Sequence, residues 1–117
     1  YHANHATDIS LRRLGLLSND PDSGAQRSEL NQLYAKTKRI VNGRPSYIDH
    51  SNKYGVWWTH IDWMIGSYSN IDNNKITHGY IQNNQDTSCP SQSDHWQEYF
   101  NSKWADNANA QIYCSGK

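Results

Sequence analysis

The sequence is short of several features that mark common functional classes. Its 117 residues include only two cysteines, three prolines, one methionine and one phenylalanine. The 11 basic residues are balanced by 11 acidic ones, which removes the general electrostatic argument for nucleic-acid binding. No apolar run approaches the ~18 residues that a transmembrane helix requires, so the sequence predicts no membrane span.

Familiar catalytic motifs are also missing. The chain contains no Gly-x-Ser-x-Gly, no His-Glu-x-x-His and no glycine-rich phosphate loop. The segment from Asn19 to Gly24 looks like the start of a calcium loop, but the twelfth position would fall on Leu30, which cannot bind calcium. The sequence therefore favours neither an enzyme of these classes nor an EF-hand.

The two cysteines, Cys89 and Cys114, are too few for a thiolate zinc site. In an oxidising compartment they would form one disulfide, worth ~3 kcal/mol in the chain-entropy model. The alternative is two buried thiols in a cytosolic protein. The chain begins at Tyr1 without a signal peptide, as a processed secreted protein does. It has no Asn-x-Ser/Thr sequon, so we expect secretion without N-glycans.

The chain is rich instead in aromatic rings and turn-forming residues. Five tryptophans and eight tyrosines must supply much of the buried area, because other large apolar side chains are few. Asn, Gln, Ser and Asp make up the polar bulk and favour turns. Short alternating segments separated by such turns predict an all-β domain, either a small antiparallel sandwich or a barrel.

Three of the five tryptophans fall in one predicted β-hairpin, with arms Val56–Thr59 and Asp62–Ile65. A tight turn, or a four-residue loop, pairs Trp58 with Trp63. Side chains alternate along a strand, so these two rings share an apolar core face while Trp57 lies on the mixed opposite face and need not be buried. The predicted core face consists of Val56, Trp58, Trp63 and Ile65.

Residues 1–27 are assigned to an N-terminal segment that precedes a β-rich module of residues 28–117. Thr7 or Asp8 can cap a short helix in this segment, although Gly15 weakens it. The apolar positions of the predicted helix are Ile9, Leu11, Leu14, Leu16 and Leu17.

Three motifs follow one another in the β-rich part: Asn-Gly-Arg-Pro-Ser-Tyr from Asn42, Trp-Met-Ile-Gly from Trp63, and Cys89-Pro90 followed by Trp96, Trp104 and Cys114. In this order, over about residues 28–115, they resemble a small module of multidomain secreted and cell-surface proteins of aquatic eukaryotes. The resemblance implies a secreted β-rich module with a Cys89–Cys114 pair. It implies no catalytic residues.

One basic cluster stands out in this neutral chain. Two of its lysines share a strand face, and the Asn42-Gly43 turn can return an arginine alongside them. Such a patch can hold sulfate, carboxylate or phosphate, whereas the alternative is a charged edge strand that blocks aggregation. Together with an exposed tryptophan, it predicts a non-catalytic module that binds an extracellular glycan or protein. The candidate ligand-binding residues are Trp57, Lys36, Lys38, Arg39 and Arg44.

Histidines suggest two alternatives. A small secreted hydrolase would use His60 or His78 with a carboxylate such as Asp62. The adjacent pairs Asp49-His50 and Asp94-His95 form no dyad by themselves, because neighbouring residues in a strand point to opposite faces.

A metal-binding or structural extracellular protein is the other alternative. The amino terminus with His2 and His5 offers nitrogen ligands to copper, nickel or zinc. The competing interpretation is a frayed polar tail.

Overall fold

The chain forms one antiparallel sheet in which nearly all strands pair in sequence order. The computed structural model describes residues 8–13, 30–72, 79–93, 95–100, 103–106 and 110–115. Over these ranges the strand order is β8-β7-β6-β5-β4-β3-β2-β1-β9. No helix in these ranges is long and apolar enough to cross a membrane. The strands are β1 (Asp8–Arg13), β2 (Leu33–Val41), β3 (Arg44–Asp49), β4 (Tyr54–Trp58), β5 (Trp63–Ser67), β6 (Gly79–Asn83), β7 (Gln97–Phe100), β8 (Lys103–Asp106) and β9 (Ala110–Ser115).

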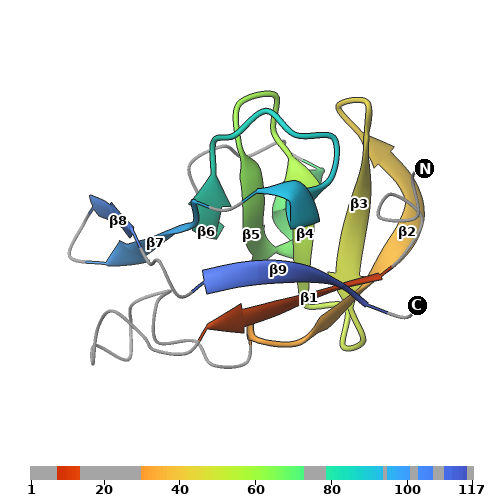
Figure 1. Cartoon of the computed structure of the whole chain (residues 1–117). Helices are drawn as coiled ribbons and strands as arrows, with labels where there is room; N and C mark the ends of the chain where they lie inside the picture. Colours follow the sequence, from red (N-terminus) through yellow and green to blue (C-terminus); the bar gives the residue numbers. More distant parts are fainter. Residues whose placement is uncertain are drawn as a thin grey trace.

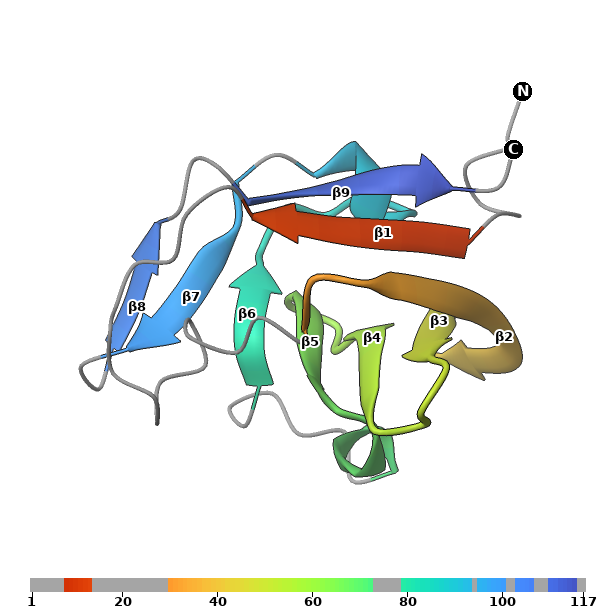
Figure 2. The same ribbon diagram turned by 90° about the horizontal axis from the view of Figure 1, so that it is seen from below.

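The sheet curls into a half-barrel. β1 and β9 lie across β3–β5 in Figure 1, and Figure 2 shows β2 bending from beside β1 to beside β3. The β2–β3 pairing shifts register between Lys36 and Ile40. An irregularity of this kind bends a strand and increases its twist. The prediction of an all-β antiparallel domain is therefore confirmed.

The concave side of the curled sheet holds the main core. Alternate residues of the central strands point into it, together with residues from β1 and β9. Aromatic rings supply much of its volume, as the composition predicted. The buried residues of the main core are Ile9, Leu11, Leu30, Tyr34, Tyr47, Tyr54, Val56, Trp58, Trp63, Ile65, Ile81, Trp96, Ala110 and Ile112.

The central hairpin has the predicted register. Val56 lies opposite Ile65, and Trp58 lies opposite Trp63. The ring centroids of the two tryptophans are 5.7 Å apart. All four side chains are buried in the main core, so the predicted core face is confirmed.

The opposite face of this hairpin is covered. Trp57 is 0% exposed and packs with Met64 in a second apolar cluster. The 3₁₀ turn η3 (Tyr68–Ile71) lies over β4 and contributes to this cluster. An ion pair between Arg39 and Asp72, 2.6 Å long, fastens the end of the turn to β2. The prediction that Trp57 presents an exposed ring is wrong, because a segment later in the chain covers it.

Residues 8–13 form strand β1 and not the predicted helix. β1 lies between β2 and β9 and pairs with both. Ile9 and Leu11 are 0% and 1% exposed, while Arg12 is exposed, which is the period-two pattern of a strand. The helix prediction for this stretch is therefore wrong, and this part of the N-terminal segment belongs to the same sheet as the rest. Residues 14–29 lie outside the described residues.

The predicted disulfide between Cys89 and Cys114 is also corrected, because the structure holds no disulfide among the residues that it describes. Cys89 is completely buried and precedes the 3₁₀ turn η4 (Pro90–Gln92), which lies against β9. The backbone at Cys114 pairs with Ile9 of β1. A buried cysteine packs as a small apolar side chain and needs no disulfide to be accommodated.

Candidate functional site

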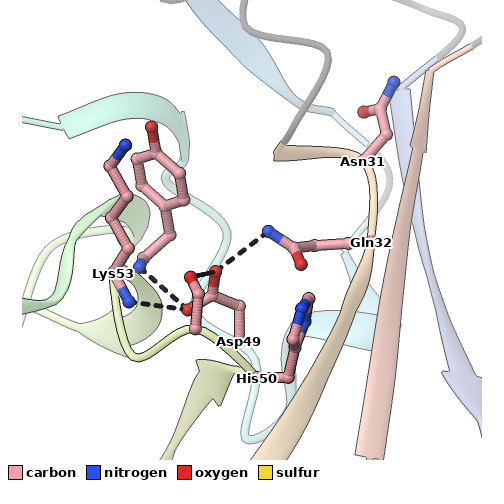
Figure 3. A pocket seen from close by; sticks show the side chains of 7 residues that line it. Asn31, Gln32, Asp49, His50 and Lys53 are labelled. Atoms are coloured by element: carbon pink, nitrogen blue, oxygen red, sulfur yellow. Dashed lines mark hydrogen bonds between the residues drawn. The ribbon is translucent and has the colours of Figure 1, made fainter.

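A pocket opens at the loop between β3 and β4. Its volume is about 530 Å³, within the range in which proteins bind small molecules. Figure 3 shows Asn31 and Gln32 on one side, Lys53 on the other and Asp49 between them. We call it the β3–β4 pocket. Its lining residues are Asn31, Gln32, Asp49, His50, Ser51, Lys53 and Tyr54.

Asp49 fixes the shape of the pocket. The β2–β3 register sets it opposite Tyr34, near the start of β2. Its carboxylate accepts hydrogen bonds from the side chains of Gln32 and Ser51, at 3.1 and 2.7 Å. The backbone N–H groups of residues 53 and 54 donate to the other oxygen, at 2.8 and 3.0 Å. An ionised carboxylate offers about four lone-pair positions, so all of them are filled.

These hydrogen bonds also set the protonation state of Asp49. Burial alone would raise the pKa of the Asp49 carboxyl, but the hydrogen bonds from Ser51, the backbone and Gln32 together outweigh burial and hold that pKa below its usual value. The carboxylate is therefore ionised at neutral pH. With every acceptor position occupied, it neither supplies a proton nor orients the neighbouring imidazole of His50. Asp49 therefore serves to hold the loop between β3 and β4 in place.

Two basic side chains line the pocket, and neither forms an ion pair within the described part of the chain. The ammonium of Lys53 lies 5.4 Å from the ring centroid of Tyr54, a cation–π contact worth ~0.5–1 kcal/mol at an exposed site. Both Lys53 and His50 are exposed. The four donors already occupy the lone pairs of Asp49, so the basic groups left to meet a ligand are the ammonium of Lys53 and the imidazole of His50.

The four residues of the predicted basic cluster differ in their partners. Lys36 and Lys38 are exposed on β2 and form no ion pair in the ranges described. The guanidinium charges, in contrast, are matched by carboxylates. The two ion pairs, each 2.6 Å long, are Arg39–Asp72 and Arg44–Asp86.

Arg44 has a structural role. Its guanidinium carbon lies 3.9 Å from the centroid of the Trp58 ring, and one of its nitrogens donates to the carbonyl of Thr87. The indole N–H of Trp63 donates to the same carbonyl at 3.0 Å. Arg44 therefore ties the loop after β6 to the central hairpin.

The predicted hydrolase residues are not brought together. His60 is exposed at the tip of the central hairpin with a φ of 87°, whereas Asp62 is 8% exposed. Burial raises the pKa of the Asp62 carboxyl. Among the described residues no hydrogen bond joins these two side chains, and the hydroxyl of Thr59 instead accepts from the backbone N–H of Asp62 at 3.0 Å. His78 lies outside the described residues.

The proposed metal ligands His2 and His5 also lie outside the described residues, so a copper, nickel or zinc site there stays a prediction. Within the described ranges no group of three or more His, Cys, Asp or Glu residues is placed to hold a metal ion.

Sequence reasoning missed the β3–β4 pocket. One local signal was present, since the stretch from Asp49 to Asn52 contains Asp, Ser and Asn, which favour a turn in which the Asp side chain accepts hydrogen bonds from nearby backbone N–H groups. Asn52 indeed has a φ of 62°, and its N–H donates to the carbonyl of Asp49 at 3.0 Å. No local signal shows that Gln32 joins this turn, because that contact depends on the pairing of β2 with β3.

Comparisons with known proteins give no relative. A scan against protein-family models, a search of curated proteins and a search of solved structures each found no match. The resemblance to an extracellular module therefore stays a prediction, and function must be inferred from the geometry of the chain itself.

Proposed function

We propose that this protein is a non-catalytic binding module whose β3–β4 pocket takes an acidic saccharide. The observation that supports the proposal is the ammonium of Lys53, which has no carboxylate partner among the described residues. It lies beside amide side chains and a carboxylate already saturated with donors. Such a pocket attracts a ligand that carries both negative charge and hydroxyl groups.

The chemistry of each lining group fits this class of ligand. Lys53 and His50 can donate to a ligand carboxylate, and such charge-assisted hydrogen bonds are stronger than neutral ones. Asn31 and Gln32 carry amides, which donate to and accept from hydroxyl groups. Asp49 holds the loop in shape, and its four donors occupy the oxygen lone pairs that would otherwise face a ligand.

The predicted extracellular location forms part of this proposal. Acidic polysaccharides are displayed in extracellular matrices and cell walls, where a small secreted module would meet them. The basic strand of Lys36 and Lys38 remains a competing place for the same ligand, since both residues are exposed.

Titration calorimetry at low salt tests the proposal with trigalacturonate and with its methyl ester, which has the same rings without the charges. We expect the acid to bind and the ester to bind far more weakly. Lys53→Met should weaken binding by about ten- to a hundredfold, because a hydrogen bond to a charged group is worth ~1.5–3 kcal/mol and ~1.4 kcal/mol is tenfold.

Lys103→Met is the matched control, because Lys103 is also exposed and lies on β8, away from the pocket lining. It should leave the affinity unchanged. Equal affinity for acid and ester, or no heat with either, would overturn the proposal. If the double variant Lys36→Met/Lys38→Met lost binding and Lys53→Met did not, the binding site would lie on the basic strand.

A further inference from the structure

A row of polar side chains crosses three strands on the outer face of the sheet. The register sets Gln82 of β6 opposite Gln97 of β7, and Gln97 opposite Asp106 of β8. The amide nitrogen of Gln82 donates to the amide oxygen of Gln97 at 3.0 Å. The amide nitrogen of Gln97 donates to the carboxylate of Asp106 at 3.1 Å. The three side chains thus form one hydrogen-bonded ladder.

The ladder lies on the face opposite the main core. The neighbouring row pairs Ile81 with Glu98, and both are 0% exposed. Since side chains alternate along a strand, residues flanking Glu98 point to the outer side. The ladder side chains are exposed or half-buried, so solvent reaches them.

Two aromatic rings extend the same face. Tyr99 and Trp104 lie opposite each other on β7 and β8, two residues along from the ladder. Their ring centroids are 5.3 Å apart at an angle of 65°. Tyr99 is 40% exposed, and Trp104 is half-buried because it packs against the second apolar cluster. The rings are therefore fixed in place and still accessible from outside.

The ladder keeps hydrogen-bonding capacity after its internal bonds are made. A glutamine amide has two N–H groups and one oxygen, and a carboxylate has two oxygens. Within the described residues, one N–H of each glutamine, the oxygen of Gln82 and one oxygen of Asp106 have no protein partner. These donors and acceptors lie on neighbouring strands, which are ~4.8 Å apart.

We propose that this β6–β8 face, formed by Gln82, Gln97, Tyr99, Trp104 and Asp106, binds a neutral saccharide chain. The two rings offer apolar surfaces to the C–H faces of the sugars. The amide and carboxylate groups of the ladder form hydrogen bonds with the sugar hydroxyl groups. Asp106 is the one ionisable group of the ladder, and its charge disfavours an anionic chain. This site is independent of the β3–β4 pocket and differs from it in the sign of its charge preference.

Affinity electrophoresis in gels that contain hydroxyethylcellulose, a neutral polymer, tests the proposal. The Lys53→Met protein serves as the parent, so that the β3–β4 pocket does not contribute. We expect the polymer to retard the parent. Tyr99→Ala and Gln97→Ala should each raise the dissociation constant at least tenfold. Tyr113→Ala is the matched control, because Tyr113 on β9 is 45% exposed, close to the 40% of Tyr99, and lies outside the β6–β8 face.

Gels with carboxymethylcellulose, which has the same backbone with anionic groups, test the charge preference. The parent should be retarded less than in the neutral gel, and Asp106→Asn should narrow that difference. Thermal melting of each variant separates binding from folding. A parent that the neutral polymer does not retard would overturn the proposal. So would lower melting temperatures in Tyr99→Ala and Gln97→Ala with unchanged retardation, since the ladder would then serve only to join β6, β7 and β8.

Discussion

Asp49→Asn tests the hydrogen-bonded core of the candidate pocket. The carboxylate accepts four hydrogen bonds, while an asparagine amide has a single oxygen with two lone pairs. Two donors therefore lose their acceptor and face the new NH₂ group. At ~1.5–3 kcal/mol for each hydrogen bond to a charged group, we expect a loss of ~3–6 kcal/mol in the free energy of unfolding. This is a large part of the ~5–15 kcal/mol typical of a folded domain.

Urea unfolding followed by tryptophan fluorescence measures this loss at pH 7. Asp72→Asn is the matched control, since Asp72 is 71% exposed and its ion pair with Arg39 should contribute at most ~1 kcal/mol.

The pH dependence gives a second check on Asp49. Its pKa is lower in the folded state than the ~3.9 of an unfolded aspartate, so its contribution is complete above about pH 4. That contribution is lost as the pH falls through the folded pKa, and the gap between wild type and variant should narrow there. The reasoning would be refuted if Asp49→Asn lost no more free energy of unfolding than Asp72→Asn. It would also be refuted if the stability difference between wild type and Asp49→Asn did not change with pH.

Two further variants test burial. Trp57→Ala should lower the free energy of unfolding by ~3–5 kcal/mol, about as much as Trp58→Ala, because both rings are buried. A loss of less than ~1 kcal/mol for Trp57→Ala in denaturant unfolding would contradict the burial of this ring. Burial raises the pKa of the Asp62 carboxyl, because it disfavours the charged form. The protonated carboxyl therefore contributes fully to stability below the pKa of the unfolded state, and this contribution is lost as the pH rises through the pKa of the folded state. Asp62→Asn should therefore raise the melting temperature at pH 7 and leave it unchanged at pH 3.

Local sequence patterns predicted the features that depend on neighbouring residues. The register of the central hairpin followed from alternation together with a short connection, which place Trp58 opposite Trp63 on one apolar face. The Asn42-Gly43 turn followed from backbone preference, and both residues have positive φ, at 53° and 85°.

Features that depend on distant segments were not predictable in this way. Trp57 looked exposed because its own hairpin supplies no cover, and η3 reaches it only in the folded chain. The apolar residues of β1 are compatible with the period of a helix or of a strand. The stretch forms a strand because it pairs with β2 on one side and β9 on the other. The two arginines of the basic cluster form ion pairs with carboxylates that lie 33 and 42 residues away in the sequence.

The candidate site shows the same division. The turn from Asp49 to Asn52 has the residue types of an Asp-initiated turn, yet the pocket needs Gln32, which arrives through the β2–β3 pairing. The ladder on the β6–β8 face likewise depends on the register of three strands, which single-strand patterns do not fix.

Amide chemical shifts of the ¹⁵N-labelled protein, titrated with trigalacturonate, test the central claim most directly. The account predicts shift changes that saturate and concentrate at Asn31, Gln32 and residues 49–54, with none on the β6–β8 face. Changes centred on Lys36 and Lys38, or no changes at millimolar trigalacturonate, would contradict the assignment of the β3–β4 pocket as the binding site.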